Sequence, residues 1–402
     1  MPIVALMEFS TSARRNLQRR HHRLLLLLAM AAVVPTTGHA QDENSSASAY
    51  AALPVFDALS AKEWQKVEKS VDRGLAWLAT KVEPLGGMPT AMGGQPAVTS
   101  LTTMAFLSRG HRPGIGPYGK VIERMIDYAL SKQKPDGLWL TETTDYAPSE
   151  AHHGSHTAIY NHAITGMMLG EVYGMTDPDR AERIREAMPK ALAFLRKMQR
   201  RPSENPEDRG GLRYFHPQSG RPQSDLSVTG WCVMFYRSAR NAEFEVPEEY
   251  ILEAAEFVRG CYDTNTGAFV YSPLSQEWHL GRGMTGAGLL CLTMAGERDN
   301  QIARAAGQWI LDHPFTQYQK NEGDFDRFHY GAYYCSQAMF MLGGDYWRQF
   351  YPVMAQSLLD NQQSAGNWQV ERTDERFGEV YSTALAILSL TPPYQLLPIY
   401  QR

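Results

Sequence analysis

Two apolar patterns alternate along the chain from residue 60 onward. In the first, apolar residues recur at steps of three and four and so share one helical face, as do Ile184, Met188, Ala191, Leu195 and Met198. Such a stripe predicts an amphipathic helix whose opposite face lies in water. It predicts outer helices at 60–80, 118–133, 178–199, 247–262, 299–312 and 347–362.

The second pattern is apolar or small on every side, which is typical of helices that are buried all round. These stretches are 98–108, 158–173, 226–238, 284–295, 330–342 and 380–390. Strict alternation of six exposed and six buried helices predicts an all-α fold. We expect an (α/α)6 toroid of six helical hairpins, with the buried helices as an inner ring. An open solenoid is the alternative, although it would leave one side of each inner helix in water.

Prolines mark one outer helix. Asp177 followed by Pro178 predicts a helix start, with a capping residue and a proline in the first turn. Pro189 lies inside the same stretch, and it predicts a kink there or two shorter helices.

A short motif recurs at the ends of the outer helices. DYALSKQKPDGLW at 127–139 and AQSLLDNQQSAGNW at 355–368 are close copies, with weaker echoes at 190–214, 254–269 and 73–81. Repetition at this spacing indicates an array of supersecondary units that share one core. The glycine and aromatic residue would turn the chain and place a ring between neighbouring units.

These repeats resemble those of the prenyltransferase/squalene-cyclase family, which includes terpenoid cyclases and protein prenyltransferase β subunits. The family motif ends in Gln, a spacer and Gly-x-Trp, and Gln133 to Trp139 and Gln362 to Trp368 match it. The resemblance covers about 60–393 and implies a six-hairpin toroid with a central cavity. Because the motif serves packing, it specifies the fold better than the function.

The first forty residues have the organisation of a signal peptide. Five arginines precede the apolar run Leu24 to Val34, and Gly38-His39-Ala40 is a small-x-small cleavage site. The run is about half of the roughly 20 residues that a spanning helix needs, so we expect no stable membrane anchor. We predict a signal peptide at 1–40, a flexible segment at 41–58 and one toroid domain at 59–402, exported to the periplasm or beyond. The Sec route is favoured, with twin-arginine export as the alternative.

Charge and cysteine content limit the kinds of partner and cofactor that the protein is expected to bind. Removing the net charge of +4 carried by residues 1–40 from the −4 of the whole chain leaves −8. An acidic surface repels phosphate backbones, so no nucleic-acid partner is expected. Four widely spaced cysteines do not form a disulfide scaffold. His152, His153 and His156 lack a recognised metal-ligand spacing, and no metal or other cofactor is predicted. We expect a monomer with a small-molecule ligand.

If the inner helices are parallel, their N-terminal ends open on one end of the ring, where six loops meet. This end is the predicted ligand site. The catalytic candidates are Asp326, His329 and Asp225, and the ligand-binding candidates are His156, Tyr160, His162, His279, Arg282, Asp324, Tyr330, Glu379 and Tyr381.

Each main candidate also has a structural interpretation. Asp326 and His329 form the best acid/base pair, with an ion pair between Asp326 and Arg327 as the alternative. Asp225 stands where an N-cap would stand. His162 lies inside a helix, where a hydrogen-bonded core histidine is the commoner state.

The resemblance carries catalytic residues over only in part. The cyclases use an Asp-x-Asp-Asp motif whose third position protonates the substrate, and the nearest match is Asp324-Phe325-Asp326-Arg327. Asp326 fits the acid position, but Arg327 replaces the last aspartate, and an adjacent guanidinium favours the ionised form. The prenyltransferase zinc motif, Asp-x-Cys, has no counterpart, since Cys335 follows Asp326 by nine residues.

Three functions remain open. The preferred one is an exported toroid that binds a small, isoprenoid or other apolar, ligand among His156, Asp225, His279, Asp326 and His329, without established catalysis. The second is a terpenoid cyclase or prenyltransferase with Asp326 as acid. The third is a six-hairpin glycosidase or lyase in which Asp326 with Asp225 or Glu379 supplies two carboxylates.

Overall fold

The computed structural model describes residues 56–91, 93–142, 151–216, 221–274, 280–320 and 326–401, except for the side chains of 151–154. All of them belong to one unit, Tyr50–Arg402. The predicted signal peptide, most of the segment 41–58, and the candidates His279 and Asp324 lie outside the described residues.

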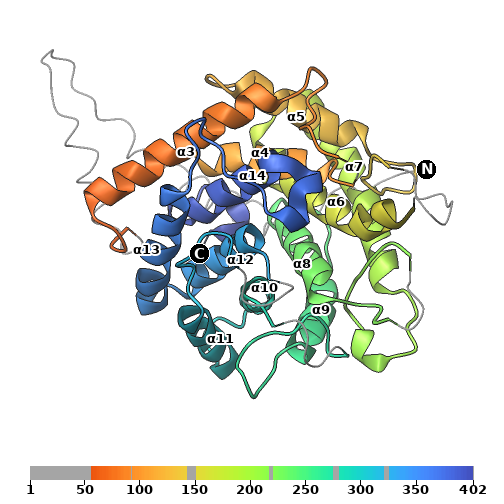
Figure 1. Cartoon of the computed structure of the whole chain (residues 1–402). Coiled ribbons are helices and arrows are strands. Elements are labelled where there is room, and N and C mark those ends of the chain that lie inside the picture. Colours follow the sequence, from red (N-terminus) through yellow and green to blue (C-terminus); the bar gives the residue numbers. More distant parts are fainter. Residues whose placement is uncertain are drawn as a thin grey trace, which may run out of the picture. The chain divides into compact units, whose positions relative to one another are not determined.

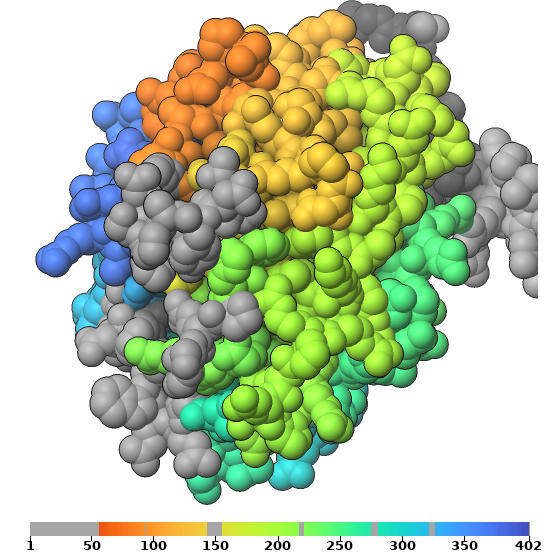
Figure 2. Space-filling view, turned by 90° about the vertical axis from the view of Figure 1, so that its right-hand side faces the viewer, coloured from red at the N-terminus to blue at the C-terminus, as the bar shows by residue number. Residues whose placement is uncertain are grey.

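Six amphipathic helices form the outer wall. They are α3 (Ala61–Lys81), α5 (Gly119–Ser131), α7 (Pro178–Gln199), α9 (Glu248–Gly260), α11 (Gln301–Asp312) and α13 (Gly344–Asp360). Figure 2 looks at the wall from the side where α5 and α7 cover the face. All six lie within a few residues of the stretches predicted from the apolar stripes, because burial of one face sets both the pattern and the position.

The helix α7 begins as predicted, since the Asp177 side chain accepts hydrogen bonds from the backbone of Asp179 and Arg180. Division of this helix at Pro189 is wrong, because α7 runs unbroken from Pro178 to Gln199. Pro189 is exposed. The carbonyl that loses its N–H partner therefore faces water, which supplies the missing hydrogen bond.

Six buried helices form the inner ring. They are α4 (Ala97–Ser108), α6 (Ala151–Val172), α8 (Leu226–Asn241), α10 (Arg282–Met294), α12 (Phe328–Leu342) and α14 (Gly378–Leu390). Each contacts the next, and α14 contacts α4, so the ring is closed (Figure 1). Every residue of α4 is buried. The predicted all-α toroid is confirmed, and the open solenoid is not what forms.

The inner helices run parallel. The hydroxyl of Tyr160, in the middle of the longer helix α6, lies 2.5 Å from that of Ser227 at the start of α8. Near their C-terminal ends, Ser238 of α8 donates to Glu171 of α6 at 2.6 Å.

Elsewhere in the ring, the starts of α10 and α12 lie together at Gly283 and Tyr330, and the ends of α4 and α14 lie together at Ser108 and Thr391. We call the side on which the inner helices begin the N-terminal rim and the opposite side the C-terminal rim.

Aromatic side chains meet across the middle of the ring. Trp231 of α8 stacks on Tyr333 of α12 with 5.2 Å between ring centroids, and it meets Tyr334 edge-on. From the C-terminal segment, Tyr400 reaches the same cluster, with its hydroxyl 2.5 Å from that of Tyr333. Space for a ligand is therefore to be sought on the rims.

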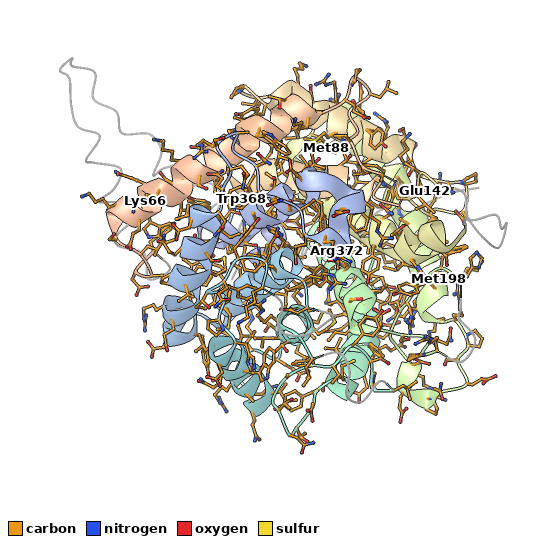
Figure 3. All side chains as sticks on the ribbon, viewed as in Figure 1. Lys66, Met88, Glu142, Met198, Trp368 and Arg372 are labelled. Atoms are coloured by element: carbon orange, nitrogen blue, oxygen red, sulfur yellow. The ribbon has the colours of Figure 1, made fainter. Side chains whose placement is uncertain are left out.

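The recurring motif ties neighbouring units of the wall together. Gln133 donates to the carbonyl of Ala187 in α7 at 2.9 Å and also to Gly137. Gln362 does the same to Ser70 in α3, which joins the last unit to the first. Trp368, labelled in Figure 3, is fully buried beside this junction. The repeated residues therefore have a structural role, since they join neighbouring units of the outer wall.

Candidate functional site

Hydroxyl groups from three inner helices meet at the N-terminal rim. Tyr160 of α6 touches the Ser227 hydroxyl of α8, and the Tyr330 hydroxyl of α12 donates to the Ser227 carbonyl at 3.3 Å. Since α8 and α12 are not neighbours in the ring, the contact of Tyr330 with Ser227 spans its middle. Burial raises the pKa of Tyr160 and of Tyr330, so both phenols are neutral hydrogen-bonding groups.

Asp225 lies beside these hydroxyls and is fully buried. One carboxylate oxygen caps α8, accepting hydrogen bonds from the Val228 backbone at 2.8 Å and the Ser227 hydroxyl at 2.6 Å. The other oxygen lies 3.5 Å from Nε of Arg213. Burial raises the pKa of Asp225, against the opposing effect of Arg213. Asp225 is therefore the N-cap of α8, as its position in the sequence suggested, and its second carboxylate oxygen faces the Arg213 guanidinium.

A wall of aromatic rings stands next to Asp225. The hydroxyls of Tyr214 and Tyr271 lie 3.1 Å apart, and the Arg213 guanidinium lies 4.9 Å and 5.6 Å from the two ring centroids. The candidate His156 packs edge-on against Tyr214, with 4.4 Å between centroids. This part of the rim thus combines ring faces with hydroxyl, guanidinium and imidazole groups.

The candidates Asp326 and Arg282 form a buried ion pair. The Asp326 carboxylate accepts from Nε of Arg282 at 2.8 Å, and the second guanidinium nitrogen lies 2.7 Å from the same oxygen. Arg282 also donates to the Lys320 carbonyl at 2.6 Å and lies over the Phe315 ring. Arg327, the partner considered from the sequence, donates instead to the Asp326 backbone carbonyl. The pair ties the start of α10 to the loop before α12.

His329 has a carboxylate partner that sequence reasoning missed. Its Nδ1 lies 3.2 Å from Glu371, and its Nε2 lies 3.1 Å from the Tyr318 hydroxyl. The Glu371 carboxylate also accepts from the backbone N–H groups of Phe328 and His329, and so caps α12. Burial acts to raise the pKa of Glu371, but these hydrogen bonds and the His329 charge lower it overall. One sequence feature could have pointed to such a partner. Arginine stands at the N-cap of α12 and its side chain makes no capping hydrogen bond, so another residue has to cap this helix.

Asp374 is a second residue that sequence reasoning did not select. It lies in the short helix η3 (Arg372–Phe377) before α14, and Figure 3 shows Arg372, the first residue of η3, over the middle of the ring. Within the described part of the chain its half-buried carboxylate accepts no hydrogen bond. Burial and the nearby Glu371 raise its pKa to about 6, against Arg327 and Arg376. Burial and Asp374 also raise the pKa of Tyr381.

The remaining candidates occupy different positions. Glu379 is exposed and accepts a hydrogen bond from Asn367 at 2.9 Å. His162 lies deep in the wall, where Nδ1 accepts from the Trp139 backbone N–H and Nε2 donates to the Ala191 carbonyl. Burial lowers its pKa to about 3, so it is neutral. The same backbone position is bound in other units by Thr99, Thr229, Thr285 and Thr383.

Within the described residues, no group of three or more His, Cys, Asp or Glu side chains is placed to hold a metal ion, and the side chains of His152 and His153 are not described. No helix in that part of the chain is long and apolar enough to cross a membrane.

Solved structures share this fold at low sequence identity. A type II terpene cyclase, MstE from Scytonema, in complex with geranylgeranyl dihydroxybenzoate, superimposes with a TM-score of 0.56 at 13% identity, covering 84% of this chain and 100% of the cyclase. A glycosidase gives 0.54 at 11% identity over 84% and 100%. A D-mannose isomerase gives 0.55 at 13% over 81% and 96%. No family model matches the sequence, and no curated protein does.

The chain therefore has the α/α toroid fold of terpenoid cyclases, and the resemblance drawn from the repeats is confirmed at the level of fold. That fold is shared by enzymes that act on very different molecules, so the function has to be argued from the rim itself.

Proposed function

We propose that this protein is an exported toroid that binds a small, polyhydroxylated ligand of the carbohydrate class on its N-terminal rim. The observation that carries the proposal is the lining of that rim. Hydroxyls of Tyr160, Ser227 and Tyr330 meet there beside a buried carboxylate, Asp225, and a guanidinium, Arg213. Binding sites for small molecules combine apolar ring surface with a few fixed polar groups of this kind.

The ring faces and the polar groups suit different parts of such a ligand. Tyr214 and Tyr271 present aromatic faces with a polar tip, which suits a molecule with both C–H and O–H surfaces. Asp225 and Arg213 supply acceptors and donors for its hydroxyls. An isoprenoid chain offers no hydrogen-bonding groups to these side chains, so it would use only the aromatic faces of this rim.

Two carboxyl groups of this rim have the properties of catalytic acids or bases. The pKa of Asp374 is raised to about 6, and that of Asp225 is raised by burial. A carboxyl group that titrates near neutral pH can donate and accept a proton during catalysis. We assign the acid–base role to Asp374 with Asp225 as the second carboxylate. Asp326 is less suited, because Arg282 holds it in a buried ion pair.

The isoprenoid reading stays as the second candidate, and one observation favours it. Trp231, Tyr333 and Tyr334 pack against one another in the middle of the ring, and aromatic faces stabilise cations. The MstE neighbour binds geranylgeranyl dihydroxybenzoate. For Asp326 to act as the acid, its carboxylate would have to be released from Arg282.

Ligand binding separates the two candidates. Thermal unfolding and calorimetry of the chain from residue 41 would be run with a panel of mono- and disaccharides and with geranylgeraniol. We expect a saccharide to bind, and Tyr330→Phe and Asp374→Asn to weaken binding by about tenfold each.

Matched control variants lie on the outer wall. Tyr346→Phe and Asp360→Asn make the same chemical changes on α13, and they should leave binding unchanged. Binding of geranylgeraniol alone would replace the first candidate by the second. Equal binding by the rim variants and the controls would show that this rim is not the site.

A further inference from the structure

A hollow lies on the C-terminal rim, and it contains none of the residues of the proposed ligand site. It has a volume of about 310 Å³, at the lower end of the range for small-molecule sites. The ends of α8, α10 and α12 and the C-terminal segment supply its lining: Arg237, Asn241, Met294, Arg298, Met341, Pro398, Ile399 and Gln401. We call it the C-terminal hollow.

Two guanidiniums of this hollow are not neutralised. Within the described residues, neither Arg237 nor Arg298 makes an ion pair or a hydrogen bond through its side chain. By contrast, Arg240 on the same helix lies 3.9 Å from Glu248. Burial lowers the pKa of Arg237, and the charges of Arg240 and Arg298 lower it further. Like charges are therefore crowded at this point, which an anion would relieve.

Glu171, a buried acid below the hollow, does not pair with either arginine. Glu171 lies under the hollow, where its carboxyl accepts from the Ser238 hydroxyl at 2.6 Å and from the Ile399 N–H at 3.1 Å. Burial raises its pKa to about 7, so near neutral pH it carries only part of a charge.

Helix-end electrostatics explain only part of this arrangement. Cations are favoured in the last turn of a helix, which accounts for Arg240 but not for Arg237, one turn earlier in α8. Arg298 lies instead in the segment after α10. Two separate elements thus direct guanidiniums at one hollow, whose floor of Met294, Met341 and Ile399 is buried and apolar.

We propose that the C-terminal hollow binds a small oxyanion, a phosphate or carboxylate group carried by a small molecule, between Arg237 and Arg298. Guanidiniums bind such groups through paired, charge-assisted hydrogen bonds. The side-chain amides of Asn241 and Gln401 also line the hollow. Each donates one N–H within the chain, to Pro398 and Gln395, and has a second N–H to offer the anion. The apolar floor accommodates a short organic part. The proposal is independent of the function of the N-terminal rim.

Inorganic phosphate and acetate test the hollow directly. Each would be titrated calorimetrically into the chain from residue 41, with chloride holding the ionic strength constant. We expect saturable phosphate or acetate binding at one site, weakened about tenfold by Arg237→Gln and by Arg298→Gln. A preference for phosphate identifies a phosphate-bearing ligand, and a preference for acetate a carboxylate-bearing one.

Arg240→Gln is the matched control, since Arg240 does not line the hollow and should keep the wild-type affinity within about twofold. Arg298 is exposed, so Arg298→Gln tests the site even where a change at the half-buried Arg237 disturbs folding. Binding that is not saturable, or that all three variants weaken equally, would overturn the proposal.

Discussion

Asp374 shows how one carboxyl group links stability to chemistry. Its pKa is raised in the folded protein to about 6 from an ordinary 3.8, so its protonated form is favoured there. The stability that this protonation contributes is present below about pH 4 and is lost as the pH rises through 6. The folded protein therefore keeps a carboxyl group that is unfavourable at neutral pH, a feature that is common at functional sites.

Replacing Asp374 by asparagine should remove that cost. We expect Asp374→Asn to raise the free energy of unfolding at pH 7.5 by about 1–2 kcal/mol, and to make little difference at pH 4. Urea unfolding of the variant and the wild type at both pH values measures the change. Asp360→Asn on the exposed face of α13 is the control and should show no such trend. A stability difference that does not vary with pH would contradict the raised pKa.

The glycines of the recurring motif act at the level of whole helices. Gly137 has φ of 96°, and a Cβ there would lie 2.3 Å from the backbone oxygen of Lys190 in α7. The neighbouring outer helix therefore approaches so closely that no side chain fits between. The same close approach recurs at Gly210 and Gly366, so the contact is a property of the array.

A methyl group at this position should push two outer helices apart. We expect Gly137→Ala to lower the free energy of unfolding by about 2–3 kcal/mol, from the clash and the positive φ together. Gly174→Ala is the control, because a Cβ at Gly174 meets nothing within 4 Å. Calorimetric unfolding of both variants makes the comparison, and an equal effect of the two would refute the close-packing argument.

The buried pair of Arg282 and Asp326 also acts between elements, since it fixes the loop before α12 against the start of α10. Breaking a buried ion pair on one side leaves an uncompensated charge. We expect Arg282→Leu to cost about 3–5 kcal/mol in denaturant unfolding, and the double variant with Asp326→Leu to cost less.

Ligand binding provides the second measurement on this pair. If Asp326 is structural, Asp326→Asn should lose stability while it keeps the ligand affinity of the N-terminal rim. If Asp326→Asn instead keeps its stability and loses the conversion of a bound ligand, Asp326 is the catalytic acid.

At the scale of the whole molecule, the sequence predicts the helices far better than the site. An outer helix differs from an inner one in how much of its surface is apolar, and that difference can be read along one segment, as in α7 against α4. The partners of His329 could not be found in this way. Glu371 lies 42 residues away, and it reaches His329 because the next inner helix, α14, packs against α12.

His162 and Asp374 show two ways in which the sequence fails to identify site residues. His162 was a candidate but has a structural role, and Asp374 was not selected although its pKa is raised. His162 occupies a wall position that takes threonine in other units, and its role follows from the Trp139 and Ala191 backbone groups that it binds. Asp374 belongs to a loop that was expected on the N-terminal rim, but its raised pKa depends on burial and on Glu371. Such properties arise from tertiary surroundings, which periodicity does not encode.

The proposed export would place the four cysteines in an oxidising compartment. Cys232, Cys261, Cys291 and Cys335 are free thiols, and all of them are buried. In an oxidising compartment, exposed thiols would pair with one another or with other proteins, and burial prevents this. A toroid that shields its thiols is therefore compatible with export.

The proposed export can be tested with the full chain. Expressed in a bacterial host, it should be cleaved after Ala40 and recovered outside the cytoplasm as a chain beginning at Gln41, as intact mass and cell fractionation would show. Placing arginines at Leu26 and Leu27 interrupts the apolar run on which signal recognition depends, so this variant should stay uncleaved in the cytoplasm. Alkylation of the exported protein should label four cysteines after unfolding and almost none before it. Recovery of the uncleaved wild type from the cytoplasm would overturn the assignment of residues 1–40, and the fold and both proposed binding sites would stand without it.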